Sequence, residues 1–455
     1  MASINDLPEY VLEYILLHVS PYSDLKSCSQ VNHLWNRMAK SALEKKRRGL
    51  NEAVQKQALD WFIKRQQAGT SSCIQKRHSH ACAVLGRRMY IFGGCTSNTS
   101  TTYNDLWSFD LSRRVWVRPL SFGTPPPPKA CSSLIAYKEK LVLFGGWAHT
   151  SPYYPLYNSW RIFDSIHLFD PALNRWTEVA RRESSGFCPA TAGHSAALFR
   201  KNLMLLFGGL QALDDGRGPP YNMSNDIWLL DLRSMQWQKQ TIEGKKPKAR
   251  YGHSQIIVDD HHIFIIGGCS GPDEMLYDMW LLEALDDGDS EGFPSGRNWK
   301  WHLIEVTNQK DGAPRLSFHP ACRVGDNVVI LGRSRYAKKN ILHRSGSSGP
   351  STLNAADFNF PPNTSGTKAW QSTMCVYALN ISELVEKHRV TWLERGETSA
   401  RQPEHLVLYT LVKGEGELLM FGGIRRDSTA APRTDNNVET ASNTLYSLSF
   451  QQAVI

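Results

Sequence analysis

The residues with the clearest capacity for chemistry in this sequence are histidines that stand next to serines. The pairs His194-Ser195 and His253-Ser254 each follow a glycine, as an activated serine nucleophile often does. The G-x-S-x-G elbow of serine hydrolases needs a second glycine, but Ala197 and Ile256 occupy that position. Because both pairs recur at the same place in two similar segments, the sequence favours a structural role for them.

Patterns for metals and nucleotides are equally weak. A copper oxidase would need several convergent ligands, and the candidates His149, His167 and His302 have no motif spacing. The segment 414–416 reads Gly-Glu-Gly and lacks the third glycine and the basic residue of a nucleotide loop. We expect no cofactor, no metal and no enzymatic activity. A metal-dependent oxidase stays open as an alternative, which bound metal in the purified protein would reveal.

Composition narrows the class of protein. The chain has 455 residues, 41% hydrophobic and 21% charged, so it has enough apolar material to fold. Its N-terminus has no basic region followed by an apolar stretch, and no run approaches the roughly 18 apolar residues of a spanning helix. The nine cysteines lie far apart with no C-x-x-C pair, as expected of reduced thiols. We expect a cytoplasmic or nuclear protein that does not bind membranes.

The basic character of the chain has two explanations. A net charge of +9 favours acidic partners or simply solubility. The basic residues are dispersed rather than interleaved with aromatics along one element, so we expect no nucleic-acid binding. The run Lys45-Lys46-Arg47-Arg48 is either a nuclear import signal or the solvated end of a helix, where cations suit the dipole.

An internal repeat determines the expected architecture. An apolar run ending in Gly-Gly occurs five times, and a sixth copy ends in Gly332-Arg333. After most of these runs comes a stretch similar to Asn-Asp-Leu-Trp-x-x-Asp-Leu, as in 103–111 and 224–232. The second glycines of the five pairs are Gly94, Gly146, Gly209, Gly268 and Gly423, and the lone tryptophans that close the units are Trp116, Trp176, Trp237, Trp301 and Trp392.

Short alternating segments separated by turns predict antiparallel hairpins, with four strands in each unit. Six such units are typical of a β-propeller rather than a sandwich. The glycines would let a strand end turn tightly beside the next blade without a Cβ clash, and the tryptophans would fill the space between blades. Arg333 in place of a glycine makes the turn of the fifth blade uncertain.

The last unit has no closing tryptophan, which would leave an open sheet edge. Elsewhere a closing tryptophan precedes the next first glycine by 29 to 32 residues, and Trp61 precedes Gly93 by 32. We therefore predict that residues 59–72, around Trp61, complete the last blade. Alternatively, this segment extends the preceding helix.

The first 44 residues predict three short helices. Between Tyr10 and Val19 eight of ten residues are apolar or aromatic, too many for a helix with one solvated face. A module of this size is too small to bury such a helix, so part of its surface must meet the propeller or another chain. Residues 45–58 indicate a polar helix or linker.

Both parts resemble known families. The pattern Leu-Pro-x-x-Val-Leu-x-x-Ile-Leu over 7–16, continued by apolar residues at 25, 28, 31 and 35, resembles the F-box, and the units over 74–450 resemble kelch repeats. The resemblance implies a mainly β fold: a six-bladed kelch β-propeller over 59–455 with a small N-terminal α-helical F-box module over 1–44. It also implies docking to the Skp-type adaptor of an SCF-type cullin-RING E3 ubiquitin ligase. The implied adaptor-binding residues are Leu7, Pro8, Val11, Leu12, Ile15, Leu16, Leu25, Val31 and Trp35.

The protein substrate is expected on one end of the propeller. Strands in a blade alternate in direction, so the loop after each diglycine and the loops between blades emerge together. Aromatic and arginine side chains there, which are enriched at binding hot spots, predict a grip on an acidic or phosphorylated segment. The aromatics of 147–163 can instead pack that loop against itself. The predicted substrate-binding residues are Trp147, Tyr153, Tyr154, Tyr157, Trp160, Arg161, Arg217, Tyr221, Arg77, Arg250, Arg425 and Arg426.

Together these patterns give a functional hypothesis: a substrate receptor that holds a protein near the ligase machinery and does no covalent chemistry itself. The alternative is an interaction scaffold, unrelated to a ligase, that uses the propeller alone. The insertion 334–371 is rich in Ser, Gly, Asn and Lys and is assigned no function.

Overall fold

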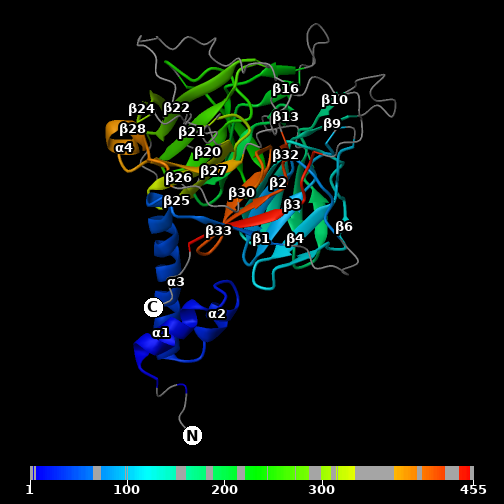
Figure 1. Ribbon diagram of the computed structural model, residues 1–455. Coiled ribbons are helices and arrows are strands. Elements are labelled where there is room, and N and C mark those ends of the chain that lie inside the picture. The colour runs from blue at the N-terminus through cyan, green and yellow to red at the C-terminus, as the bar shows by residue number, and fades with distance from the viewer. Residues whose placement is uncertain are drawn as a thin grey trace, which may run out of the picture.

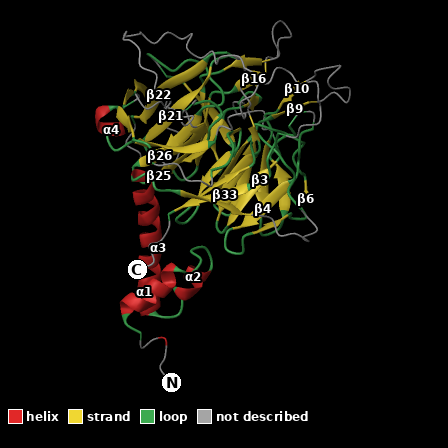
Figure 2. Ribbon diagram, viewed as in Figure 1, coloured by secondary structure: helices red, strands yellow, loops and turns green. Residues whose placement is uncertain are grey.

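The structure is a computed structural model in which a long helix connects a small helical module to a ring of sheets (Figure 1). Nearly all helical residues belong to that module, and the rest of the molecule is strand and loop (Figure 2). The residues it describes are 4, 7–64, 73–97, 99, 101–149, 160–180, 188–212, 221–242, 244–271, 273–285, 299–308, 314, 316–333, 373–396, 402–425 and 440–450. The insertion 334–371 lies outside them.

The helical module contains α1 (Glu9–Leu17), α2 (Asp24–Cys28) and α3 (His33–Gln55). Asn32 caps α3, because its side chain accepts a hydrogen bond from the backbone N–H of Trp35 at 2.9 Å. The helix then continues without a break for 23 residues, so most of the segment 45–58 is helical. The core of the module is formed by Leu12, Leu16, Leu25, Met38, Ala39 and Ala42.

The two halves of α3 belong to different cores. Its first half packs on α1 and α2, whereas Leu50, Ala53 and Val54 in its second half are buried among propeller side chains, including Trp61 and Leu331. One helix therefore joins the module to the ring.

The ring has six blades, each an antiparallel sheet of four strands. Blade one is β2 (Ala81–Leu85), β3 (Arg88–Phe92), β4 (Leu106–Asp110) and β5 (Val115–Val117); blade two is β7 (Ser133–Tyr137), β8 (Lys140–Phe144), β11 (Ile166–Asp170) and β12 (Arg175–Glu178). Blade three is β14 (Ser195–Phe199), β15 (Leu203–Phe207), β18 (Ile227–Asp231) and β19 (Gln236–Gln240); blade four is β20 (Ser254–Ile257), β21 (His262–Cys269), β22 (Met275–Ala284) and β23 (Trp299–Leu303).

Blade five is β25 (Ala321–Val324), β26 (Asn327–Arg333), β27 (Met374–Asn380) and β28 (Arg389–Trp392), with α4 (Leu384–Lys387) before its last strand. Blade six is β30 (Thr410–Lys413), β31 (Leu418–Phe421), β33 (Leu445–Ser449) and β1 (Asp60–Lys64). Two short strands, β6 (Phe122–Gly123) and β24 (Glu305–Thr307), add in parallel to the outer edges of blades two and five. These sheets confirm the predicted mainly β propeller.

Smaller sheets lie in the loops that follow the diglycines and in the connections between blades. They are β9 (Trp147–His149) with β10 (Trp160–Ile162); β13 (Thr191–Ala192) with β16 (Leu210–Ala212) and β17 (Tyr221–Met223); and β29 (Leu406–Val407) with β32 (Ile424–Arg425). They extend the strand ends on the side of the ring away from α1 and α2 (Figure 1).

The ring closes through the N-terminal strand. β1 pairs antiparallel with β33, so that Trp61 lies opposite Leu448, the arrangement that the spacing of Trp61 predicts. Around the axis each inner strand neighbours the next, and β30 of blade six returns to β2 of blade one. Six backbone N–H···O=C bonds of 2.7 to 3.3 Å run in a closed circle through Ser79, Leu408, Phe318, Gly252, Gly193 and Cys131.

The diglycines allow the blades to approach closely. Both glycines of all five pairs have φ between 59° and 104°, which L side chains rarely adopt. A Cβ on Gly93 would meet the carbonyl oxygen of Lys129 in the next blade at 2.4 Å. Blade five differs: Gly332 is absent from the positive-φ residues, and β26 pairs with β27 straight through Arg333. In blade five the strand thus continues through the position of the second glycine.

The closing tryptophans pack between blades. Trp176 contacts Phe92 of the preceding blade with ring centroids 5.5 Å apart, and the rings of Trp116, Trp237 and Trp301 lie 4.8 to 5.2 Å from Phe421, Phe144 and Phe207. These four tryptophans each cover a phenylalanine that precedes a diglycine, in the space between blades where the repeat predicts them.

Candidate functional site

The ring has two distinct ends. The hairpin turns at Gly86, Ser112, Gly325 and Glu415 lie at the end next to the helical module, which we call the hairpin face. The loops after the diglycines and between blades form the opposite end, which we call the loop face. The helical module and the loop face are therefore separated by the full height of the blades (Figure 1).

Glu417 in blade six anchors the module to the hairpin face. Its carboxylate accepts a 2.8 Å hydrogen bond from Tyr22 and pairs with Arg114 of blade one at 2.6 Å. Burial, helped by the Glu417 carboxylate, raises the pKa of Tyr22 well above its usual value, so the phenol stays a donor. Arg47 of α3 makes a second contact, forming two hydrogen bonds with Glu415. These polar contacts add to the apolar packing of α3.

On the loop face, blades one and two enclose a cavity of about 400 Å³. β9 and β10 form one wall, and their pairing places Arg161 opposite Ala148. Arg161 is exposed, with its guanidinium carbon 5.3 Å from the centre of the Phe163 ring. The cavity is lined by Thr101, Thr102, Pro127, Pro128, Ala148, His149, Arg161 and Phe163.

A buried cation lies behind this wall. The Lys129 side chain is fully buried, with Nζ 3.2 Å from the Ser165 hydroxyl and 4.6 Å from the centre of the Phe163 ring. Burial lowers the pKa of Lys129 to about 7. Arg161 makes this part of the loop face attractive to an anion, and a bound anion would favour the protonated form of Lys129.

The structure corrects the prediction for Arg77 and Arg250. Both side chains are fully buried rather than exposed on the loop face. Each binds a carboxylate through two nitrogens, Arg77 to Asp105 at 2.6 and 2.9 Å and Arg250 to Asp278 at 2.9 Å twice. Each also donates to the carbonyl of a diglycine. Each fastens the connection that leads into its blade to the blade itself, and neither is available to a substrate.

The other predicted loop-face residues are dispersed. Trp147 is half-buried at the start of β9, and Tyr221 is exposed on β17 of blade three. Arg425 is exposed on β32 of blade six and pairs with Glu404. The structure thus places Trp147 and Arg161 on the paired strands β9 and β10, where Arg161 lines the cavity and Trp147 does not, and it places Tyr221 and Arg425 in other blades. Tyr153, Tyr154, Tyr157, Arg217, Arg426 and the Trp160 side chain lie outside the described residues.

The helical module exposes part of its apolar surface. Ile15 and Val31 are 39% and 59% exposed, and Pro8 is also exposed. Leu7, Val11 and Trp35 are half-buried. Two further exposed aromatics, Tyr10 and Tyr14, were missed in the sequence analysis, although their i, i+4 spacing places them on one face of α1.

Three predicted adaptor contacts need correction. Leu12, Leu16 and Leu25 are at most 3% exposed, because they form the core between the helices. They shape the module, and the surface available to a partner consists of the exposed and half-buried residues instead.

The histidines considered for catalysis have structural roles. His253 is buried and His194 is half-buried, both between blades, and Nε2 of His253 lies 2.6 Å from the Ser195 hydroxyl. Burial lowers the pKa of both imidazoles to about 3, and the guanidinium of Arg250 contributes for His253. Within the described ranges, no group of three or more His, Cys, Asp or Glu side chains could hold a metal ion.

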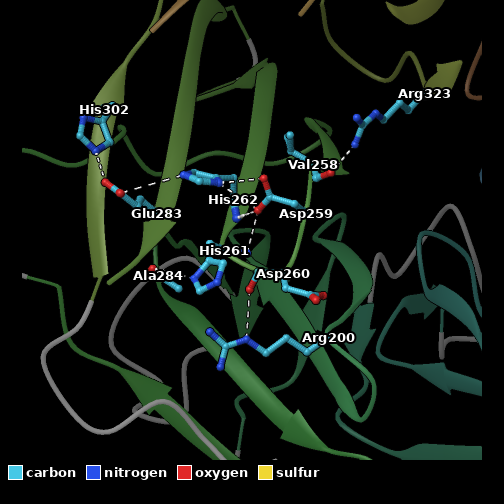
Figure 3. A network of polar contacts seen from close by, with 10 residues as sticks. All are labelled: Arg200, Val258, Asp259, Asp260, His261, His262, Glu283, Ala284, His302 and Arg323. Carbon is cyan, nitrogen blue, oxygen red and sulfur yellow. Dashed lines mark hydrogen bonds and ion pairs between the residues drawn. The ribbon is translucent and has the colours of Figure 1, made fainter. Parts of the chain in front are cut away.

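A polar network around the turn at 258–262 ties blade four to its neighbours (Figure 3). Asp259 accepts from His262 at 2.9 Å, and Glu283 accepts from His302 at 2.7 Å. Arg200 of blade three donates to the Asp260 carbonyl at 3.1 Å, and Arg323 of blade five donates to the Val258 carbonyl. The network lies on the hairpin face and connects three blades.

Comparison with known proteins assigns both parts. Residues 4–47 match the F-box domain, and residues 77–289 match the FBX42 beta-propeller domain. The chain is an F-box/kelch protein of the FBX42 type. The F-box match ends at residue 47, within α3, so the last two turns of that helix extend from the F-box into the kelch propeller.

Several known proteins are similar to part of this chain. The F-box/kelch-repeat protein At1g51550 of Arabidopsis thaliana is 28% identical over 58% of this chain and 54% of its own length. Human Kelch domain-containing protein 1 is 26% identical over 56% and 60%, and the host cell factor homolog hcf-1 of Caenorhabditis elegans is 25% identical over 62% and 34%. The chain thus spans between a third and three fifths of these relatives.

The solved structure of YjhT supports the fold alone. It superposes with a TM-score of 0.51 at 14% identity and covers 84% of this chain and 97% of its own. In the described part of the F-box/kelch chain, no helix combines the length and apolar character needed to cross a membrane.

Proposed function

We propose that this F-box/kelch protein is the substrate-recognition subunit of an SCF-type cullin-RING E3 ubiquitin ligase. The observation that carries the proposal is that two exposed surfaces lie at opposite ends of the molecule and are connected by one continuous helix. Exposed apolar residues of the F-box, including Ile15 and Val31, lie at one end, and the loop face with Arg161 lies at the other. The helix α3 packs in both cores and joins them.

In this proposal the F-box binds the Skp-type adaptor and the loop face binds the protein to be ubiquitinated. The chain does no covalent chemistry. It raises the effective concentration of substrate lysines near the charged conjugating enzyme. We propose that it does so in the cytoplasm, the nucleus or both.

The proposed substrate carries an acidic or phosphorylated segment. Support comes from the exposed guanidinium of Arg161 at the loop-face cavity and from the Lys129 ammonium buried behind it. Lys129 has a serine hydroxyl within hydrogen-bond distance where Arg77 and Arg250 have carboxylates, so an arriving anion would add to the attraction that Glu178 exerts on Lys129.

A double variant of the F-box tests adaptor binding. Ile15→Asp with Val31→Asp places charges on exposed apolar positions, and we expect at least about tenfold weaker capture of the Skp-type adaptor and loss of ubiquitination. The buried core of the module is untouched, so the melting temperature should stay unchanged. Leu303→Asp, at an exposed leucine of blade four, is the matched control.

This variant also separates a ligase from a scaffold. Deleting residues 1–44 would remove the first part of α3, whose later residues pack in the propeller. The double variant leaves that packing intact, and a scaffold unrelated to a ligase would keep its function in it. Equal adaptor capture by the double variant and the parent would disprove the proposal.

Reversal of charge on the loop face tests substrate capture. Arg161→Glu should weaken binding of an acidic or phosphorylated peptide by about tenfold or more, as lost hot-spot contacts do. Lys201→Glu, an equal change of charge in the exposed turn between β14 and β15 on the hairpin face, should have little effect. If both variants lost the same affinity, net charge rather than this site would explain binding.

A further inference from the structure

A strip of exposed apolar side chains follows the outer edge of blades one and two. Leu120, Phe122 and Leu173 are 82%, 67% and 66% exposed, and Val115 and Val117 are 37% and 39% exposed. We call these five residues the β5–β6 strip. They are half of the ten exposed large apolar residues in the described part of the propeller, the others being Ile63, Tyr221, Tyr277, Leu285 and Leu303.

The strip begins on a free strand edge. β5 is the last strand of blade one, and in the described part of the chain β4 is its one partner. Trp116 packs inward against Phe109 and Phe421, which turns its neighbours Val115 and Val117 outward. The strand therefore presents backbone groups along its edge and two valines on its outer surface.

The corresponding strands of blades two, three and four carry polar residues on both sides of the closing tryptophan. The positions on either side of the closing tryptophan are Arg175 and Thr177 in blade two, Gln236 and Gln238 in blade three, and Lys300 and His302 in blade four. Polar and charged side chains on edge strands oppose pairing with other chains. Blade five has Thr391 and Leu393 there, and blade six has Asp60 and Phe62, so each keeps one polar residue. Blade one has valines at both positions and lacks this protection.

The fold itself shows that such edges accept another strand. β6 adds in parallel to β12 of blade two, pairing Phe122 with Arg175, and β24 adds in parallel to β28 of blade five. In both cases the added strand comes from the connection that leads into the blade. No such strand covers β5 among the described residues.

Charges around the strip select the partner. Arg113, Arg118 and Arg175 are exposed on it, and none forms an ion pair with a carboxylate of the described residues. Two copies of the strip would bring arginines against each other, which disfavours self-association. An acidic strand would instead pair its carboxylates with these guanidinium groups.

We propose that the β5–β6 strip binds an extended segment of another protein in which apolar and acidic side chains alternate. The segment adds to β5 as a fifth strand of blade one, with its apolar side chains against Val115, Val117 and Phe122. The strip lies beside the F-box, because Ser23 of the module donates a 2.9 Å hydrogen bond to Ser112 in the turn before β5. It is thus distinct from the loop face, and the inference goes beyond the proposed function.

The test uses the full chain and a short synthetic peptide of alternating valine and glutamate. We expect saturable binding in fluorescence anisotropy, together with slower amide exchange of residues 115–118 in the complex. Val115→Asp with Val117→Asp should weaken binding by about tenfold or more, and Leu303→Asp should not. An unchanged melting temperature shows that the double variant is folded.

A peptide of alternating valine and lysine is the control for charge and should bind at least about tenfold more weakly. The proposal would be overturned if the two peptides bound equally well. It would also be overturned if the double variant bound the valine-glutamate peptide as tightly as the parent chain does. Sedimentation that shows a dimer of the parent chain dissociated by the double variant would also overturn it, because a second copy would then be the occupant.

Discussion

At the level of single residues, imidazoles recur where blades meet. His80, His194 and His253 occupy the same position in blades one, three and four, each with its ring against the phenylalanine before a diglycine of the preceding blade. Each Nε2 is within hydrogen-bond distance of a hydroxyl, that of Thr410, Ser133 or Ser195. These contacts suit a neutral ring, so the junctions depend on the imidazoles staying unprotonated.

This arrangement predicts a loss of stability in acid. The pKa of His194 and of His253 is about 3 in the folded chain, against about 6.5 when unfolded, so the unfolded state binds more protons below pH 6.5. The free energy of unfolding should fall by up to about 1.4 kcal/mol per pH unit for each histidine as the pH drops from 6 toward 3. Urea unfolding between pH 7 and pH 4 measures the slope, which His194→Gln should reduce.

Sequence reasoning at this scale succeeded for residues that repeat and failed for residues whose partner is distant. The histidine-serine pairs were interpreted as structural because they recur. Arg77 and Arg250 were placed on the surface, where arginines usually lie, although each precedes its aspartate by 28 residues. That equal spacing was the available signal. The cavity beside Arg161 could not be predicted, because it depends on how the loops of blades one and two meet.

At the level of elements, the diglycine turn requires glycine for two reasons, a positive φ and the close approach of neighbouring atoms. Gly94 has φ of 90°, and a Cβ there would meet the carbonyl oxygen of His78 at 2.6 Å and the His80 side chain at 2.9 Å. Gly86 in the turn between β2 and β3 has φ of 58° but no atom within 4 Å of such a Cβ. A side chain at Gly86 would add backbone strain alone, whereas a side chain at Gly94 would add both backbone strain and a clash with neighbouring atoms.

We predict different costs for the same substitution at these two glycines. Gly86→Ala should lower the free energy of unfolding by about 1 kcal/mol, the usual penalty for an L residue at positive φ. Gly94→Ala should cost about 3 kcal/mol or more, because backbone atoms must also move apart. Equilibrium unfolding in urea compares the two variants with the parent. Equal losses would show that the blades do not need the close approach at Gly94.

Element boundaries were predicted less well than the number of elements. The repeat gave six blades, because Gly-Gly and the lone tryptophan recur in the chain. It did not give the straight course of β26 through Arg333 or the added strands β6 and β24, which depend on tertiary contacts. The continuous α3 was only partly anticipated, since the polar segment after residue 44 fits a helix and a linker equally well.

At the level of the whole molecule, the ring is closed without a covalent link. Blade six takes its outer strand β1 from the N-terminal side of the ring and its other three strands from the C-terminal side. Trp61 is 1% exposed and lies in the same apolar cluster as Leu331 of blade five and Leu50 of α3. Ring closure and attachment of the F-box therefore depend on the same cluster.

This dependence predicts that, of two equally buried tryptophans, Trp61 is needed for ring closure and Trp176 is not. Trp61→Ala and Trp176→Ala each remove a side chain that is 1% exposed, so each should cost about 3 to 5 kcal/mol of unfolding free energy. Trp61 lies in β1, which pairs with β33 and has no other strand partner among the described residues. The strand β1 can therefore leave the ring in Trp61→Ala, whereas no such release is expected in Trp176→Ala. We expect faster amide exchange of residues 445–449 in native buffer for Trp61→Ala and unchanged exchange there for Trp176→Ala.

Adaptor capture should persist in both variants, because neither tryptophan contributes to the core of the F-box module. Protected β33 amides in Trp61→Ala would mean that the ring is closed by contacts other than β1.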